Sequence, residues 1–504
     1  MVNMTIKSVP IIVGAAQYTQ PKTILKPLDP LNLMVKTSQM AISDSGVNNL
    51  KDLIDTVYMV NINGWSYKDA PGGLSKLLGI NPAQKEYLPS GGDSPQMLVN
   101  RAAKSIASEE SEAILITGGE AQYSINRAKR GKITLDWPRS RKPEYMEISP
   151  WKGTSDFENK YGLFVPSCAY ALLEMALRAD SGRNVEEHNL YMGKLFEHYS
   201  NIASENPYAW SQKPYTAEEI TTPSPENRKI NYPYTKRMCS NSFVDQSGAL
   251  LVTSTDNASK LKINKNRWVY LMGRADLKNI NSITQRPQLH DSPAAREGSK
   301  LALEQAGLKL EDINIFDIYN CFPSIVQIIR KEIGLSEDDP RDLTVAGGLP
   351  YFGGPWNNYS MHSIIASVDL IRKNPSLKIM VVANGGYNTK QSFGIYGKRP
   401  PVKQWEERAE NKIQQAITSK ALSNPIEKAN GQLSVESYTI FYDRVGSPEH
   451  VIVIGHLENK QRTLARVRGK PDNLLKLEQE DLVGKLFTVY YDSKIDRNII
   501  NIDA

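Results

Sequence analysis

Short apolar runs alternate with amphipathic helical segments in both halves of the chain, and this pattern constrains the fold more than any other. In the first 125 residues, runs such as "PIIVGAAQ" and "AILITGGE" alternate with predicted helices over residues 31–45 and 95–107. After residue 265 the order returns, with "RWVYLMG", a helix over "SPAAREGSKLALEQAGL", then "INIFDIY" and "KIMVVANGG". Such alternation indicates βαβ units, so each half is predicted to be an α/β domain.

A weak internal repeat relates the two halves. "MAISDSGV" at residues 40–47 matches "LALEQAGL" at 301–308, and both segments end a predicted helix at a glycine, as a left-handed C-cap would. Downstream, "AILITGGE" matches "IMVVANGG", an apolar strand that runs into paired glycines. A repeat longer than a hundred residues indicates a duplicated α/β domain and not a solenoid.

Two further regions have a different composition. Residues 121–240 are rich in Tyr, Trp, Pro and Asn, with convincing helices only near 166–180 and 185–203, which indicates a loop domain. Beyond residue 412, β-type segments such as "VESYTIFY" and "HVIVIGHL" predict a small, separate, barrel-like β-domain. The predicted boundaries are therefore as follows: residues 1–120 with 241–264 (N-terminal half), 121–240 (loop domain), 265–412 (C-terminal half) and 413–504 (β-rich domain).

Composition excludes several classes of protein. With 504 residues, 40% of them hydrophobic and 23% charged, the chain is long enough to bury a large core. Cys168, Cys239 and Cys321 form no CxxC or Cys/His cluster, so neither a disulfide framework nor a metal site is expected, and a cytoplasmic setting is favoured. The apolar runs are far shorter than the roughly 20 residues that span a bilayer, so no membrane span is expected. A net charge of +6 favours anionic ligands without requiring nucleic acid.

The layout and several motifs resemble the thiolase superfamily. The segment "GGDSPQMLVNRAAKSIASEESEAILITGGE" is similar to the thiolase nucleophile loop, its helix and the following strand. "IFDIYNCFPS" resembles the fourth motif of sterol-carrier-protein thiolases, "GGLPYFGGPWNN" the Gly-His-Pro loop, and "ANGGY" the Cys-x-Gly loop. The resemblance covers about 400 residues in order and implies a thiolase fold. That fold has two duplicated halves in five α/β/α/β/α layers, with an inserted loop domain.

The resemblance also implies that the residues of the thiolase reaction are altered. A thiolase needs a cysteine nucleophile at a helix N-terminus, where the dipole favours a thiolate, together with an adjacent base. Alignment places Gly92 at the nucleophile, Gly354 at the base, and Tyr319 at the His or Asn of the fourth motif. Asn384, with Ala383 as the alternative, takes the position of the second cysteine. These four substitutions, with the β-rich tail, most resemble the thiolase-like proteins of type 1. No residue is thus assigned a catalytic role.

The resemblance implies that the protein binds CoA or an acyl-CoA and that it uses no cofactor. The basic run "RAKRGK" is the candidate for the CoA phosphates, and glycine and asparagine residues of the loops are candidates for the pantetheine arm. The expected binding residues are Arg127, Lys129, Arg130, Lys132, Asn320, Gly353, Asn357 and Asn358. For the basic run, an ordinary solvated surface is the alternative.

Three classes of function stay open. The first is a CoA-binding or acyl-CoA-binding protein of lipid metabolism, related to acetyl-CoA acetyltransferases but without thiolase activity. The second is an acyltransferase with a different mechanism, and the third is a noncatalytic scaffold. Whichever function holds, the protein is expected to be a monomer or a homodimer. Nucleic acid is not expected as a partner. Cys321 and His362 are interpreted as core residues in preference to reactive groups, and His290 as a neighbour of a helix cap.

Overall fold

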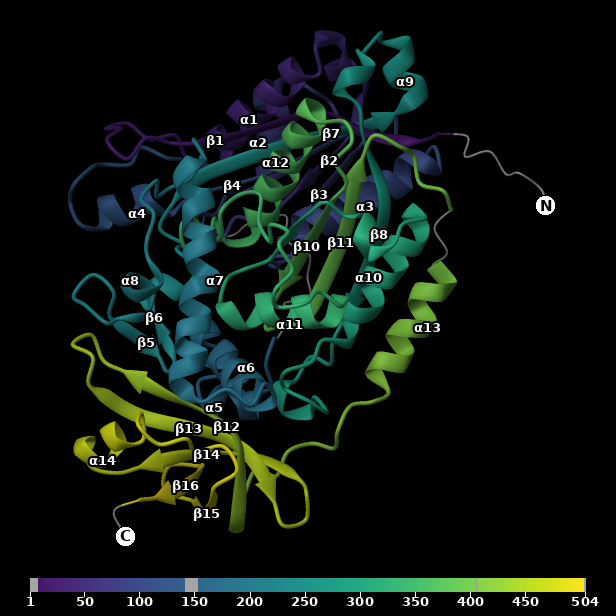
Figure 1. Cartoon of the computed structure of the whole chain (residues 1–504). Coiled ribbons are helices and arrows are strands. Elements are labelled where there is room, and N and C mark those ends of the chain that lie inside the picture. The colour runs from purple at the N-terminus through teal and green to yellow at the C-terminus, as the bar shows by residue number, and fades with distance from the viewer. Residues whose placement is uncertain (1–7, 141–152, 404–406, 503–504) are drawn as a thin grey trace.

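A computed structural model describes residues 8–140, 153–403 and 407–502 (Figure 1). Within these residues, nine strands form one mixed sheet in the order β3-β2-β4-β7-β1-β8-β11-β10-β9. Its N-terminal half consists of β1 (Pro10–Thr19), β2 (Ile54–Met59), β3 (Gln84–Tyr87), β4 (Ala113–Ala121) and β7 (Asp245–Ser254). Its C-terminal half consists of β8 (Val269–Lys278), β9 (Ile315–Ile318), β10 (Ile379–Gly385) and β11 (Lys390–Gly397).

The predicted duplication is visible in the strand pairing. In the N-terminal half, β2 and β4 are parallel, whereas β4–β7 and β7–β1 are antiparallel. In the C-terminal half, β9 and β10 are parallel, whereas β10–β11 and β11–β8 are antiparallel. The matched segments "AILITGGE" and "IMVVANGG" are therefore equivalent strands, β4 and β10. The half-sheets join where Ile11 and Ile12 of β1 pair with Tyr270 and Val269 of β8.

The same close contact between strand and helix occurs in both halves. A Cβ on Gly14 of β1 would collide with the carbonyl oxygen of Ala41 in α1 (Pro30–Asp44). A Cβ on Gly273 of β8 would collide with the carbonyl oxygen of Ala302 in α10 (Pro293–Ala306). Ala41 and Ala302 occupy equivalent positions of the repeat, so glycine is needed at both sites for the helix to approach the strand.

The helices and half-sheets form five layers. Helices α1 and α2 (Ala70–Leu78) cover the outer face of the N-terminal half, and α10 and α11 (Pro323–Ile333) lie outside the C-terminal half. Between the half-sheets lie α3 (Ser94–Ala107) and α12 (Tyr359–Lys373), which contact strands of both halves and each other. Because neighbours cover it on several sides, α12 buries ten residues instead of a single apolar stripe.

The described part of the segment between β4 and β7 contains two long helices, several short elements and extended irregular stretches. The predicted helices near 166–180 and 185–203 are α6 (Pro166–Asp180) and α7 (Val185–Glu205). Shorter elements accompany them: α4 (Gln122–Lys129), α5 (Asp156–Lys160), α8 (Ala217–Thr221), β5 (Lys229–Asn231) and β6 (Tyr234–Thr235). A single helix, α9 (Thr255–Lys260), follows β7. Short 3₁₀ turns occur at η1 (Asn48–Leu53), η2 (Lys236–Met238), η3 (Lys265–Arg267), η4 (Ile283–Gln285), η5 (Leu310–Asp312) and η6 (Trp356–Asn358).

The C-terminal segment forms a barrel-like second sheet, as predicted. Helix α13 (Glu407–Thr418) leads into strands β12 (Gly431–Tyr442), β13 (Pro448–Leu457), β14 (Arg462–Arg468), β15 (Leu486–Asp492) and β16 (Arg497–Asn501), with α14 (Pro471–Lys476) between β14 and β15. Pairing of β12 with both β13 and β15 closes this sheet on itself. Strands β5 and β6 of the loop segment extend it beyond β12, so the sheet is built from two distant parts of the chain.

Among the described helices, none combines the length and the apolar character needed to cross a bilayer.

Candidate functional site

Gly92 lies immediately before helix α3, and its surroundings leave no room for a side chain. A Cβ built on Gly92 would stand 2.5 Å from Tyr319 Oη and 2.6 Å from the carbonyl oxygen of Asn384. Both distances are shorter than real Cβ contacts, and the second involves backbone, which cannot move aside cheaply. The fold thus brings together three of the four positions that the sequence analysis singled out, Gly92, Tyr319 and Asn384.

Tyr319 and Asn320 follow strand β9 and are buried. The Tyr319 ring packs edge-on against Tyr359 with centroids 5.7 Å apart, and burial raises the pKa of its phenol well above the ordinary value. Asn320 Nδ2 donates to the carbonyl of Ile318 (2.8 Å), and Asn320 Oδ1 accepts from the amide of Leu349 (2.7 Å). Asn320 therefore links the end of β9 to Leu349 in the glycine-rich loop, residues 347–358.

Asn384 lies near the end of β10, and both ends of its side-chain amide are engaged. Its Nδ2 donates to Tyr170 Oη (2.8 Å), and its Oδ1 accepts from Gln391 Nε2 (2.9 Å). The side chain is 1% exposed. These bonds orient the end of β10, so that the Asn384 carbonyl takes the space beside Gly92.

The glycine-rich loop, residues 347–358, connects the two halves. Asn357 Oδ1 accepts from Ser90 Oγ and from the Gly91 amide, both at 2.9 Å, and Asn358 Nδ2 donates to the Gly118 carbonyl (2.9 Å). Gly353 has a φ of 112°, a conformation that other residues rarely adopt. Two asparagines thus attach this loop to the segment that precedes Gly92 and to strand β4.

Gly354, the fourth singled-out position, has different neighbours. Its amide donates to the Asn241 carbonyl (2.8 Å), and a Cβ at this position would collide with Ser240 Oγ. Gly354 therefore packs against the segment that precedes β7, whereas the neighbours of Gly92 are Tyr319 and Asn384.

Asp93 is a residue of this site that the sequence analysis missed. It holds the N-cap position of α3 but makes no capping hydrogen bond with its side chain. Its carboxyl is 5% exposed, and Oδ1 has no hydrogen-bond partner. Burial raises the pKa of Asp93, and the nearby ammonium of Lys390 opposes that shift. In "GGDSP" the aspartate has the pattern of an ordinary helix cap, so nothing in the sequence distinguishes it.

The basic cluster lies on and just after α4, which directly follows β4. Arg127 Nη1 donates to the carbonyls of Lys22 (3.0 Å) and Ile24 (2.7 Å), so its guanidinium holds a neighbouring loop. Lys129, Arg130 and Lys132 are exposed. Strand β4 also carries Gly118, which binds Asn358, so the cluster and the glycine-rich loop are attached to the same strand end.

The cysteine and histidine residues of the motifs are core residues or neighbours of a cap. Burial raises the pKa of the Cys321 thiol to about 12, which disfavours a thiolate at neutral pH. His362 is fully buried, its Nδ1 lies 2.9 Å from Gln17 Oε1, and burial lowers its pKa to about 3. His290 lies 3.4 Å from Asp180 and close to Ser292, which caps α10.

Comparison with known proteins agrees with this architecture. Residues 412–494 match the thiolase-like protein type 1 additional C-terminal domain. The chain is 22% identical over 306 residues to an acetyl-CoA acetyltransferase of Methanocaldococcus jannaschii, covering 60% of this chain and 70% of that protein. It shares its fold with human mitochondrial 3-ketoacyl-CoA thiolase, solved in complex with CoA, at a TM-score of 0.55 and 16% identity, over 77% of this chain and 98% of that chain.

The similarity to one bacterial structure is much stronger. A monomeric SCP2-thiolase like protein type 1 from Mycobacterium smegmatis superimposes with a TM-score of 0.83. The two sequences are 31% identical, and the match covers 98% of each chain, including the loop segment and the second sheet. The protein therefore belongs to the SCP2-thiolase like protein type 1 family.

Proposed function

We propose that this thiolase-related protein binds CoA or an acyl-CoA without performing thiolysis. The observation that carries the proposal is Gly92, whose side-chain space at the start of α3 is taken by Tyr319 and by the Asn384 carbonyl. A nucleophilic thiolate at that place would need a side chain that the residue lacks. The raised pKa of Cys321 argues against that buried cysteine as a substitute nucleophile.

CoA is the proposed ligand because its chemistry suits the groups around the site. The exposed cations Lys129, Arg130 and Lys132 are the proposed contacts of the phosphates, with the pantetheine arm directed toward the glycine-rich loop. The names of the relatives, an acetyl-CoA acetyltransferase and a thiolase solved with CoA, support the same ligand. We further propose a role in lipid metabolism, a monomeric state like that of the Mycobacterium smegmatis relative, and a reducing, cytoplasmic setting for the three free cysteines.

Calorimetric titration with CoA and acetyl-CoA tests this proposal. We expect a dissociation constant in roughly the micromolar to millimolar range that rises with salt, because surface charge attraction is screened over about 8 Å at physiological ionic strength. Changing Lys129, Arg130 and Lys132 together to Glu should weaken binding about tenfold or more. The matched control changes Lys260, Lys262 and Lys265, an exposed cluster beside α9, to Glu and should leave binding unchanged.

The other outcomes distinguish the remaining functions. Cleavage of acetoacetyl-CoA by CoA at about 1 per second, within the usual enzyme range, would contradict the absence of thiolysis. Transfer of the acetyl group of acetyl-CoA to water, giving acetate and CoA, that is lost in Asp93→Asn would favour an acyl-transfer enzyme that uses this buried carboxyl as acid or base. If no heat of CoA binding is detected at low salt and millimolar ligand, the scaffold function replaces the CoA proposal.

A further inference from the structure

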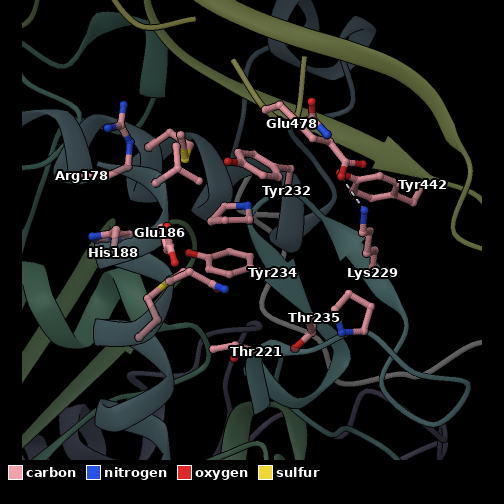
Figure 2. A pocket seen from close by; sticks show the side chains of 17 residues that line it. Arg178, Glu186, His188, Thr221, Lys229, Tyr232, Tyr234, Thr235, Tyr442 and Glu478 are labelled. Carbon is pink, nitrogen blue, oxygen red and sulfur yellow. Dashed lines mark hydrogen bonds and ion pairs between the residues drawn. The ribbon is translucent and has the colours of Figure 1, made fainter. Parts of the chain in front are cut away.

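A cavity lies where the loop segment meets the C-terminal sheet, and Figure 2 shows its lining. Its volume is about 410 Å³, within the range of small-molecule sites. Helices α6 and α7 and the segment 221–235 form most of the wall, and Tyr442, Glu478 and Gln479 of the C-terminal part complete it. The additional C-terminal domain thus contributes directly to this cavity.

The basic groups that face the cavity are paired with carboxylates. Lys229 Nζ lies 2.5 Å from Glu478 Oε2, and Arg178 Nη2 lies 2.5 Å from Asp481 Oδ2. Glu186 stands exposed at the rim. His188 is paired with the buried Glu174, which also accepts from Tyr234 and Gln327. Because each lining cation has a carboxylate partner, the described lining offers no unpaired cation to an anionic ligand.

The end of the cavity near the C-terminal sheet holds two buried polar groups whose hydrogen bonding is incomplete. Figure 2 shows Glu478, Tyr442 and Lys229 grouped there, with Arg178 and His188 at the opposite end. Glu478 Oε1 and Tyr442 Oη are buried, and neither makes a hydrogen bond of standard geometry. Tyr442 and Glu478 nevertheless contact each other: burial, then a hydrogen bond to Glu478 and its negative charge, raise the pKa of the Tyr442 phenol. A hydroxyl placed between them would donate to the carboxylate and accept from the phenol.

The remaining wall is apolar and suits a compact hydrocarbon body. Met175, Met192, Pro223 and Pro233 line it together with the ring of Tyr232, which stacks on Tyr438 with centroids 5.7 Å apart. We infer that this cavity binds a small uncharged alcohol, with its hydroxyl between Glu478 and Tyr442 and its apolar body against the methionine and proline side chains. The inference is independent of CoA binding at the Gly92 site.

Three probes with the same body and different head groups test the inference on the full-length protein: benzyl alcohol, benzoate and benzylamine. Ligand-observed NMR titration should give benzyl alcohol a roughly millimolar dissociation constant, as expected for a ligand of this size. Benzoate would meet the like charge of Glu478, and benzylamine would compete with Lys229 for it, so both should bind about tenfold more weakly. Equal affinity for the three probes, or no binding of benzyl alcohol at roughly ten millimolar, would overturn the inference.

Two variants and one control locate the binding. Tyr442→Phe keeps the ring and should weaken benzyl alcohol binding about two- to tenfold, the effect of one neutral hydrogen bond. Glu478→Gln removes the charge that pairs Lys229 and should reverse the preference, so that benzoate binds better than benzyl alcohol. The control, Tyr490→Phe, alters an exposed tyrosine of β15 and should leave the affinity for all three probes unchanged. An unchanged order of probes in Glu478→Gln, or equal effects of Tyr442→Phe and Tyr490→Phe, would contradict the assignment.

Discussion

The proposed function depends on the lack of space for a side chain at Gly92, and adding a single methyl group there tests it. Gly92→Ala would place a Cβ 2.5 Å from Tyr319 Oη and 2.6 Å from the Asn384 carbonyl. We expect it to lower the free energy of unfolding in urea by about 1–3 kcal/mol, the usual cost of overpacking. Adding Tyr319→Phe should recover only part of that loss, because the backbone carbonyl stays in place.

The control for this prediction is Gly73→Ala in helix α2. There a Cβ meets only a methyl group of Leu31 at 3.1 Å, and alanine favours the helix. If Gly92→Ala is as stable as Gly73→Ala, the space beside Gly92 is not filled as described, and a larger side chain could stand there.

The buried imidazole of His362 leads to a prediction about how the stability of the protein depends on pH. Because its folded pKa is about 3 and the ordinary value is 6.5, the folded protein keeps this imidazole neutral while the unfolded chain binds a proton. The stability that depends on neutral His362 is complete above pH 6.5 and is lost as the pH falls toward 3. Between pH 6 and 4, His362→Asn should therefore reduce the slope of unfolding free energy against pH by up to about 1.4 kcal/mol per unit.

His456→Asn is a control of opposite sign for the His362 experiment. Glu436 lies 3.0 Å from His456 and raises its pKa, so the stability that His456 adds is present at low pH and lost as the pH rises through the folded pKa. Urea denaturation at several pH values measures all three proteins. Equal slopes for the parent and His362→Asn would refute a neutral, buried His362.

At the scale of elements, the longer helices and strands could be predicted from the sequence, whereas the pairing between distant strands could not. Alternating apolar runs and glycine caps locate α1, α10, β4 and β10, because those signals are local. Strands β5 and β6 have three and two residues, too few for any periodicity to appear. Strand β5 pairs with β12, and β6 pairs with β5. Because β12 is far away in sequence, no local pattern predicts this pairing.

Helix α6 shows why the candidate sites were only partly predictable. Its residues from Ser167 to Arg178 are all buried, so its pattern shows no solvent face and does not reveal its contacts. Tyr170 reaches Asn384, Glu174 binds His188, and the Leu172 carbonyl accepts from Ser437 of β12. Resemblance to thiolases singled out Gly92, Tyr319, Asn384 and Gly354, of which the fold brings the first three together. Asp93 and the cavity beside the C-terminal sheet depend on tertiary packing and could not be predicted from local sequence.

At the scale of the whole molecule, the C-terminal sheet and the rest of the chain share a core. Ile452, Ile454 and Leu464 belong to the same buried cluster as α6 and α11. The amide of Tyr232 donates to the Ile440 carbonyl (2.9 Å), and Thr439 donates to the Tyr232 carbonyl (2.8 Å). The sequence pattern predicts that the β-rich tail, residues 413–504, is a separate domain. Because of these contacts, we expect instead that the rest of the chain needs the tail to fold stably.

Ending the chain after Lys412 should therefore yield a protein that aggregates or melts at a markedly lower temperature. Removal would expose apolar side chains of α6 and leave β5 without its neighbour. Soluble yield and the thermal midpoint measure the effect. As a control, a protease site inserted after Asn424 should give two pieces that still elute together in gel filtration. A stable, soluble truncate, or separation of the nicked pieces, would make the tail an independent module.

The shared sheet also sets an order of events during synthesis. Strand β5 ends at Asn231, whereas its neighbour β12 begins only at Gly431. At roughly 5–20 residues per second, the ribosome needs about 10–40 s to make the chain between them. Through that interval the nascent chain carries an unpaired strand edge, which is the kind of surface that chaperones bind. Strand β12 must therefore leave the ribosome before the loop segment, more than 180 residues earlier in the chain, can complete its sheet.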